Sequence, residues 1–422
     1  MIAAIVSVWA LLVGIGLLMV GSGLQGSLLG IRASAEGFSV LVTGLVMSSY
    51  FAGFVLGSLA TPRLIRRVGH IRVFGALTSL ASITALLHAT FVDPIVWGFL
   101  RVMTGFCYIG LFIVAESWLN DRSTNETRGR LLSLYMIVMT GSMATGPLLL
   151  NIGRTTGFEL FVAASVLVSI AFIPLSLTAY AAPRFEEQDR FSIRQLMEVS
   201  PLGVAGCLVN GATAGALVSL VAVYGKAIGL SIDNIALLAS ASILGGTILV
   251  WPLGRLSDRF DRRLVLTGTA LAGGTLALGI VLLGVPSPTL QILAVAVVGG
   301  FIMPLYSLSV AHTNDHLHPN QMVAASSGLL LANGIGGMAG PTMAGAAMEL
   351  LGPPGFLWFP AGAMLALAGF AIFRMTRRSA VPAEEQRDFV RMPRTSGIMA
   401  DAALRNQRNR MDSDPANTFR HL

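Results

Sequence analysis

The chain has 422 residues, of which 54% are hydrophobic and only 12% are charged. A soluble protein of this length carries roughly twice that share of charged residues, so the composition indicates a membrane protein. The net charge of +7 comes from arginines that lie mostly between apolar runs, so it does not require a nucleic-acid partner. Cys107 and Cys207 both fall inside apolar runs, which excludes a disulfide framework.

Twelve apolar stretches are long enough to cross a bilayer as helices, which takes about 20 residues each. In chain order they extend over 3–22, 38–60, 72–91, 95–117, 131–150, 159–181, 202–223, 235–251, 264–285, 289–311, 324–347 and 356–375. The first stretch lacks a basic leader and a cleavage site, so we expect a retained helix. The stretches are too long for barrel strands and do not alternate. The sequence therefore predicts an all-α polytopic membrane protein.

The basic residues between these stretches predict an orientation. If both chain ends lie in the cytoplasm, 24 basic residues fall inside and three fall outside, namely Arg32, Arg154 and Lys226. Positively charged loops stay on the cytoplasmic side, so both termini are expected there. The same arginines are expected to face the anionic lipid of the inner leaflet.

Short motifs recur at a fixed distance and predict two halves. Asn120-Asp121 recurs at Asn314-Asp315, and Gly146-Pro147 recurs at Gly340-Pro341, both with an offset of 194 residues. Parallel repeats of this kind build alternating-access transporters, whose substrate site lies near the midplane between the halves. The expected units are a six-helix bundle at 1–182, a polar linker at 183–201, a second six-helix bundle at 202–376 and a disordered Arg-rich tail at 377–422.

Four motifs carry a resemblance to a known family. They are GRLSDRFDRR at 254–263, RVMTG at 101–105, GGMAGPTMAG at 336–345 and its weaker copy SMATGPLLL at 142–150. The sequence resembles the major facilitator superfamily over residues 1 to about 376. Segments such as AESWLNDRSTNETRGRLLSLYMIV are most similar to its YcaD-like bacterial subgroup.

The resemblance implies a secondary active transporter of a small organic solute, working by rocker-switch alternating access, and not an enzyme. It implies proton-coupled efflux across the bacterial inner membrane by a monomer, with the proton gradient as energy source and no cofactor. Two alternatives stay open. One is an uncoupled or uptake carrier for a neutral solute, and the other is a transporter-like assembly factor or sensor that moves nothing.

Asp258 is the main candidate for a gating residue. Family geometry implies that it faces the start of the fifth span, where Arg128 and Arg130 lie, and that this contact breaks when the inner side opens. A carboxylate at a helix N-terminus gains about 0.3–1 kcal/mol. Thr61 occupies the matching place in the first half, so we expect one such contact and not two. The wider gating set comprises Gly254, Arg255, Arg259, Arg262, Gly146, Pro147, Gly336, Gly340 and Pro341.

For these residues simpler interpretations remain. The arginines of the 254–263 loop could serve only as topology anchors, and the glycines could serve only in helix packing. His312, His316 and His318 share a loop with Asp315, for which a solvated loop is a simpler interpretation than a metal site.

Two charged residues inside spans are candidates for a charge relay. Arg101 is costly in hydrocarbon, and the resemblance implies that it faces the cavity as a substrate-anion or proton-relay cation. Glu116 could be protonatable and coupled to H⁺, or could pair with Arg128 or Arg130. Polar residues expected in the substrate cavity, where interhelical hydrogen bonding is the alternative, are Gln25, Tyr50, Tyr108, Asn210, Gln291, Tyr306 and Asn333. A cavity so poor in charge suits a neutral or amphipathic solute.

Overall fold

The computed structural model describes residues 2–124, 126–177, 191–318, 321–377, 386, 389, 391, 392 and 395. Within these ranges it contains helices and no strand. Twelve helical segments are long and apolar enough to cross a membrane, judged by length and composition. The prediction of an all-α fold with twelve spans is confirmed. The linker residues 183–190 and most of the 377–422 tail lie outside the described ranges.

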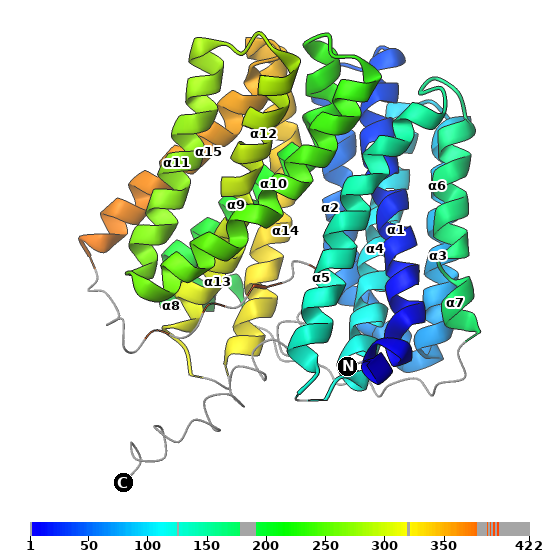
Figure 1. Cartoon of the computed structure of the whole chain (residues 1–422), viewed down its shortest axis with the longest axis horizontal. Helices are drawn as coiled ribbons and strands as arrows, with labels where there is room; N and C mark the ends of the chain where they lie inside the picture. The colour runs from blue at the N-terminus through cyan, green and yellow to red at the C-terminus, as the bar shows by residue number, and fades with distance from the viewer. Residues whose placement is uncertain are drawn as a thin grey trace.

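The first half of the chain forms one group of helices in Figure 1 and the second half forms the other. The first group comprises α1 (Ile2–Ala35), α2 (Val40–Val68), α3 (His70–Thr90), α4 (Pro94–Arg122), α5 (Arg128–Thr145), η1 (Gly146–Ile152), α6 (Glu159–Ile170) and α7 (Ile173–Ser176). The second comprises α8 (Ile193–Val199), α9 (Pro201–Ala227), α10 (Ile232–Arg259), α11 (Arg262–Leu283), α12 (Pro288–Ile302), α13 (Pro304–Asn314), α14 (Met322–Leu351) and α15 (Gly355–Met375).

Three of the twelve spans are interrupted, which the apolar runs did not predict. The fifth span tightens from α5 into the 3₁₀ helix η1 at Gly146-Pro147, and the sixth turns between α6 and α7. The tenth is broken at Met303 because Pro304 has no N–H to continue the helical ladder. At this break the Asn210 side chain on α9 donates a hydrogen bond to the Ile302 carbonyl oxygen at 2.6 Å.

Helix ends follow local chemistry. The Ser39 hydroxyl accepts from the amide of Val42 at the start of α2, and Asp93 accepts from the first amides of α4. Both side chains satisfy N–H groups that a helix leaves unpaired. Gly69 joins α2 to α3 with φ of 85°, a backbone conformation that disfavours residues with a β-carbon. Because Gly69 is the whole connection, α2 and α3 lie antiparallel.

Glycines bring the helices of each half together in matching ways. A β-carbon at Gly105 on α4 would lie 1.9 Å from the Tyr50 carbonyl oxygen on α2. Its repeat partner Gly299 on α12 meets the carbonyl of Ser242 on α10 in the same manner, at 2.6 Å. Such contacts are possible only without a side chain. The repeated positions therefore mark the same helix crossing in each half.

Two ends of the molecule need names. The basic end carries the connections α2–α3, α4–α5 and α10–α11, where Arg66, Arg122, Arg259 and Arg263 lie, and the far end is opposite. In Figure 1 the basic end is at the bottom, and α5 and α10 diverge toward it.

The two halves touch each other near the far end. On α2 and α14, Ser48 Oγ lies 2.8 Å from Thr342 Oγ1, and the amide of Leu41 donates to Glu349. Beside them, a β-carbon at Gly44 would lie 2.5 Å from the Pro341 carbonyl oxygen. On α1 and α9, Lys226 Nζ donates to the Ile31 carbonyl oxygen, and η1 packs on α10. The structure is therefore closed at the far end.

Candidate functional site

A cavity of about 230 Å³ lies between the two halves. Its walls come from α1, α2, α4 and α5 on one side and from α9, α10 and α13 on the other. Most of the lining is apolar and methionine-rich, and the polar lining includes Ser22, Tyr50, Tyr306 and Ser307. A largely apolar, concave site with few polar groups is typical of small-molecule binding.

A second cavity of about 200 Å³ adjoins the first and shares Ser22, Tyr50, Met143 and Met303 with it. It contains Arg101 and Asn333 in its lining. Three of the expected cavity residues are thus found in a cavity wall. Tyr50 lines both cavities, Tyr306 lines the larger one and Asn333 lines the smaller one. Arg101 brings to this region a full positive charge.

Arg101 is 7% exposed, and its Nε has no hydrogen-bond partner among the described residues. The guanidinium carbon lies 4.6 Å from the centroid of the Tyr50 ring, which is a cation–π contact. No carboxylate lies in the described lining of either cavity. A buried cation without a counter-ion is unfavourable, so Arg101 favours the entry of an anionic or electron-rich group.

Two expected cavity residues lie behind the wall. Gln25 on α1 is buried, and its Nε2 has no hydrogen-bond partner among the described residues. The Tyr108 hydroxyl donates to the Leu18 carbonyl oxygen at 3.4 Å, and its ring packs 6.5 Å from that of Tyr50. Neither residue belongs to the lining of either cavity, and Tyr108 instead supports Tyr50 and α1 from behind.

The expectation that Gln291 and Asn210 line the cavity is wrong for both cavities described above. Gln291 donates to the Tyr224 hydroxyl inside the second half, where both side chains are buried. Asn210 donates to the Ile302 carbonyl oxygen at the break in the tenth span, and its side-chain oxygen accepts a hydrogen bond from Asn333 Nδ2 at 2.9 Å. Interhelical hydrogen bonding, the alternative left open by the sequence, fits both residues.

Glu116 is buried on α4 and lies behind the wall of the larger cavity. Its carboxylate accepts a hydrogen bond from the Tyr135 hydroxyl on α5 at 2.8 Å, and another from the hydroxyl of Thr395. Thr395 itself lines the cavity. Glu116 is thus connected to the cavity through one hydroxyl group.

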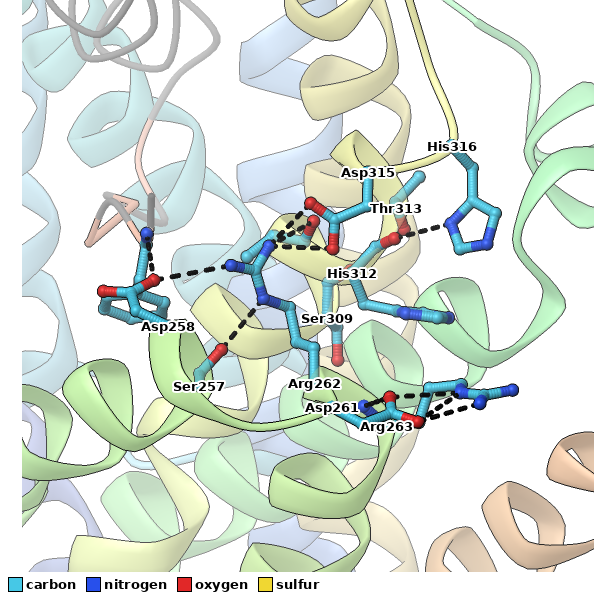
Figure 2. Close-up of polar contacts among 12 residues, drawn as sticks. Ser257, Asp258, Asp261, Arg262, Arg263, Ser309, His312, Thr313, Asp315 and His316 are labelled. Carbon is cyan, nitrogen blue, oxygen red and sulfur yellow. Dashed lines mark hydrogen bonds and ion pairs between the residues drawn. The ribbon is translucent and has the colours of Figure 1, made fainter. Parts of the chain in front are cut away.

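Arg262 anchors a network at the basic end, which Figure 2 shows. Its Nη1 lies 2.8 Å and 2.9 Å from the two carboxylate oxygens of Asp315 at the end of α13. It also donates to the Ala311 carbonyl, to Ser257 Oγ and, at 3.5 Å, to Asp258. The Arg262 side chain is 2% exposed, so it does not reach lipid headgroups as a topology anchor would. It ties α10, α11 and α13 together.

The remaining residues of the 254–263 loop differ in exposure and contact. The guanidinium of Arg255 lies 3.9 Å from the ring centroid of exposed Trp251, an arrangement that suits a membrane interface. Asp261 caps α11 and pairs with Arg263 at 2.8 Å. Burial alone raises the pKa of the Asp261 carboxyl, but the hydrogen bonds from Arg263 outweigh this and lower it below its usual range.

The Asp258 carboxylate accepts hydrogen bonds from Arg262 and from the backbone amide of Phe389, which donates to Oδ1 at 2.6 Å. Its expected contact with the start of α5 stays a prediction, as does the gating role of Arg128, Arg130, Arg259 and Gly254. Thr61, the residue in the matching place, is fully buried against Gly110 on α4. Its position is consistent with an uncharged packing residue.

The gating glycines lie at close helix crossings. β-Carbons at Gly336 and Gly340 would lie 2.0 Å from carbonyl oxygens of α9, and one at Gly146 would lie 2.5 Å from the Val20 carbonyl oxygen on α1. Because α1 and α9 are matching helices of the two halves, Gly146-Pro147 and Gly340-Pro341 have matching packing roles. The carbonyl of Pro341 also faces the other half at Gly44.

The histidines near α13 do not gather a metal site within the described residues. The rings of His312 and His316 meet edge to face, with centroids 4.9 Å apart. His312 is buried, and its carbonyl oxygen lies 2.9 Å from His316 Nδ1.

Comparison with known proteins supports the family resemblance. The profile of the Major Facilitator Superfamily matches twice, over residues 11–231 and 202–410. An uncharacterised MFS-type transporter, YcaD, of Escherichia fergusonii is 28% identical over 347 residues, covering 81% of this chain and 89% of that protein. Its Escherichia coli counterpart is 29% identical over 348 residues, with the same coverage.

Solved structures agree on the fold. The nucleoside transporter NupG has a TM-score of 0.70 at 15% identity, covering 88% of this chain and 99% of the other. A bacterial homologue of the human lysosomal transporter Spinster, inward-facing and occupied, has a TM-score of 0.67 at 16% identity, covering 87% and 94%.

Twelve spans in two matching halves around a central cavity define a membrane transporter fold. The chain belongs to the Major Facilitator Superfamily. It is a transporter and not an enzyme, and its bacterial relatives support a multi-pass protein of the bacterial inner membrane.

Sequence reasoning missed part of the site. The methionines Met19, Met136, Met139 and Met143 line the larger cavity, but their apolar character gave no signal beyond membrane burial. Arg391, Met392 and Thr395, from the expected disordered tail, also line it. At these positions the expectation of a disordered tail on the inner leaflet is wrong.

Proposed function

We propose that this transporter exports a small amphipathic organic solute by rocker-switch alternating access, coupled to the proton gradient. The observation that carries the proposal is the pair of cavities between halves that touch near the far end, with buried Arg101 in the lining of the smaller cavity. A monomer with both termini in the cytoplasm fits the arginines of the basic end. The basic end then meets anionic inner-leaflet lipid.

The solute class follows from the cavity lining. Arg101 offers a positive charge and Tyr50 offers a ring and a hydroxyl group, while methionine and aromatic side chains form a large part of the remaining wall. A solute with an apolar body and one anionic or strongly electron-rich group satisfies both features.

Glu116 is the candidate for proton coupling. It is a buried carboxylate linked to the cavity through Thr395, and protonation would remove its negative charge from the interior. Proton binding there would be coupled to movements of α4 and α5, because Tyr135 on α5 holds the same carboxylate.

Flux in proteoliposomes tests the proposal. A panel of radiolabelled amphipathic monoanions and neutral analogues is measured with and without a pH gradient, in the wild type and in Arg101→Gln and Glu116→Gln. We expect gradient-driven accumulation of monoanions, loss of anion preference in Arg101→Gln, and gradient-independent exchange in Glu116→Gln. Arg154→Gln, which removes an arginine at the far end, is the matched control.

The alternatives give different results. An uncoupled carrier is specifically favoured by the absence of a carboxylate in the described lining of the cavities, and would show the same flux with and without a gradient. A non-transporting protein would show no counterflow with any member of the panel. Flux driven by a gradient only in the uptake direction would contradict export.

A further inference from the structure

Five described residues lie beyond Arg377, namely Gln386, Phe389, Arg391, Met392 and Thr395. The last four contact the helical bundle or line its cavity. Three of them, Arg391, Met392 and Thr395, line the larger cavity between the halves. Met392 is 5% exposed and Thr395 is 8% exposed, so these tail residues are buried like core residues of the protein. This chain's own tail therefore contributes to the wall of its cavity.

The first contact lies on α10 at the basic end. The amide of Phe389 donates to Asp258 Oδ1 at 2.6 Å, and its ring packs on Gly254, where a β-carbon would lie 2.4 Å from a ring carbon. A charge-assisted hydrogen bond of this kind is about twice as strong as a neutral one. Gly254 and Asp258 of the 254–263 loop thus form the binding place of one tail residue, Phe389.

Deeper contacts reach both halves. The amide of Met392 donates to Ser307 Oγ on α13 at 3.2 Å, which belongs to the second half. The hydroxyl of Thr395 donates to the carboxylate of Glu116 on α4, which belongs to the first half. Burial lowers the pKa of Arg391, but a guanidinium stays charged at neutral pH, so the tail also adds a cation at the cavity.

The position of these contacts has a mechanical consequence. Residues of α4 and α13 that hold the tail would have to approach each other when the basic end closes in alternating access. The tail also donates hydrogen bonds to Asp258, Ser307 and Glu116, which lie on α10, α13 and α4. A tail in this place therefore favours the state that is closed at the far end.

We propose that the tail segment carrying Phe389, Arg391, Met392 and Thr395 is an intramolecular ligand of the cavity. It occupies the opening at the basic end, uses the carboxylate of Asp258, and competes with the solute until it is released. The competition with solute rests on the proposed transport function, whereas occupancy of the cavity does not. Tethering gives the segment a millimolar effective concentration, so weak contacts suffice to hold it.

Labelling of a cavity residue tests occupancy without transport. Thr140, which lines the larger cavity on α5, is replaced by cysteine, while native Cys107 and Cys207 are buried. Detergent-solubilised protein is reacted with a bulky maleimide in three forms: the full chain, a chain ending at Arg377, and a matched control ending at Ala400. The control loses much of the tail but keeps the five described residues.

We expect labelling to be about tenfold faster in the chain ending at Arg377 if the segment occupies nine cavities in ten, and unchanged in the control. Phe389→Ala with Met392→Ala in the full chain should accelerate labelling in the same direction. A synthetic peptide with the sequence of residues 386–397, at millimolar concentration, should restore protection. Equal labelling rates in all three chains would overturn the proposal.

A second measurement uses the full chain, so that the proposal can still be tested if the truncated chain fails to fold. In the full chain, Met392→Cys and Ser307→Cys should cross-link under mild oxidation, because the Met392 amide and Ser307 Oγ are 3.2 Å apart. Met392→Cys with Ser287→Cys at the far end is the control and should not cross-link. Absence of the first cross-link in folded protein would refute the proposal. If maleimide labelling gives the expected result but no solute flux is found in proteoliposomes, only the proposed transport function is refuted.

Discussion

The guanidinium of Arg262 replaces the water it loses on burial with acceptors from four residues, Ser257, Asp258, Ala311 and Asp315. A single guanidinium nitrogen, Nη1, donates to both carboxylate oxygens of Asp315, and hydrogen bonds between two charged groups are about twice as strong as those between neutral groups. Removing one partner of a buried pair leaves the other charged and unpaired, which costs more than the pair itself contributes.

We therefore expect Arg262→Met to lower the free energy of unfolding by about 3–5 kcal/mol. The double variant Arg262→Met with Asp315→Leu should recover most of this loss, because neither charge is then buried alone. Thermal unfolding in detergent measures both, and exposed Arg259→Met is the control. A double variant no more stable than the single one would contradict the assignment.

Asp261 gives a smaller, pH-dependent contribution. Its pKa is held below the ordinary value of 3.8, so the stabilisation is present above that value and is lost as the pH falls through the lower pKa of the folded state. Asp261→Asn should lose about 0.5–1 kcal/mol at neutral pH.

The test compares unfolding of both proteins between pH 6 and about 3, the region in which carboxyl groups titrate. The stability difference between wild type and Asp261→Asn should shrink toward the acid end. Glu126→Gln, at an exposed position, is the control. A difference that stays constant with pH would contradict the pairing with Arg263.

At the level of helices, composition and spacing were sufficient for the twelve spans and their two matching groups. The offset of 194 residues predicted that Gly105 and Gly299 have related places, and both allow the close approach of a neighbouring helix. The break at Met303 was not predicted, because Pro304 is a single residue within a run that is apolar throughout. The Asn210 side chain that accompanies the break can be recognised only once α9 lies beside it.

Side-chain partners were less accessible to sequence reasoning. Asp315 was visible as part of a repeated Asn-Asp pair, but its partner Arg262 is 53 residues away and meets it only through the packing of α11 on α13. Gln291 and Tyr306 are similar polar insertions in one apolar run, yet one faces Tyr224 and the other faces the cavity. The side of the helix on which each residue lies decides which neighbour its side chain faces. The sequence does not give this side, because it does not fix where the helix begins or where it is broken.

The crossing of α14 on α9 offers a test at this scale. Gly340→Ala places a β-carbon 2.0 Å from a backbone oxygen that cannot move independently, so we expect severe loss of folded protein. Gly362→Ala on α15 meets nothing within 4 Å and should be neutral or stabilise by up to about 1 kcal/mol. Monodisperse yield in detergent and the unfolding temperature measure both, and equal yields would refute the close crossing.

For the whole molecule, the contact between α2 and α14 joins the two halves. A cross-link at this contact therefore tests movement of the halves relative to each other and not the folding of either half. Ser48→Cys with Thr342→Cys should form a disulfide under oxidation, because the two side-chain oxygens lie 2.8 Å apart. Oxidation should lock the far end closed and stop flux, and a reductant should restore it. The two single variants are controls, and undiminished flux in the fully cross-linked protein would contradict alternating access.

The methionine-rich wall of the larger cavity has a consequence for selectivity. Methionine side chains are unbranched and polarisable, so they adapt to guests of different outline, whereas branched residues would present a fixed surface. Met19, Met136, Met139 and Met143 would therefore accommodate a range of apolar bodies, with Arg101 as the common point of attachment. We expect this protein to be a polyspecific carrier, whose ligands share size and polarity more than they share a scaffold.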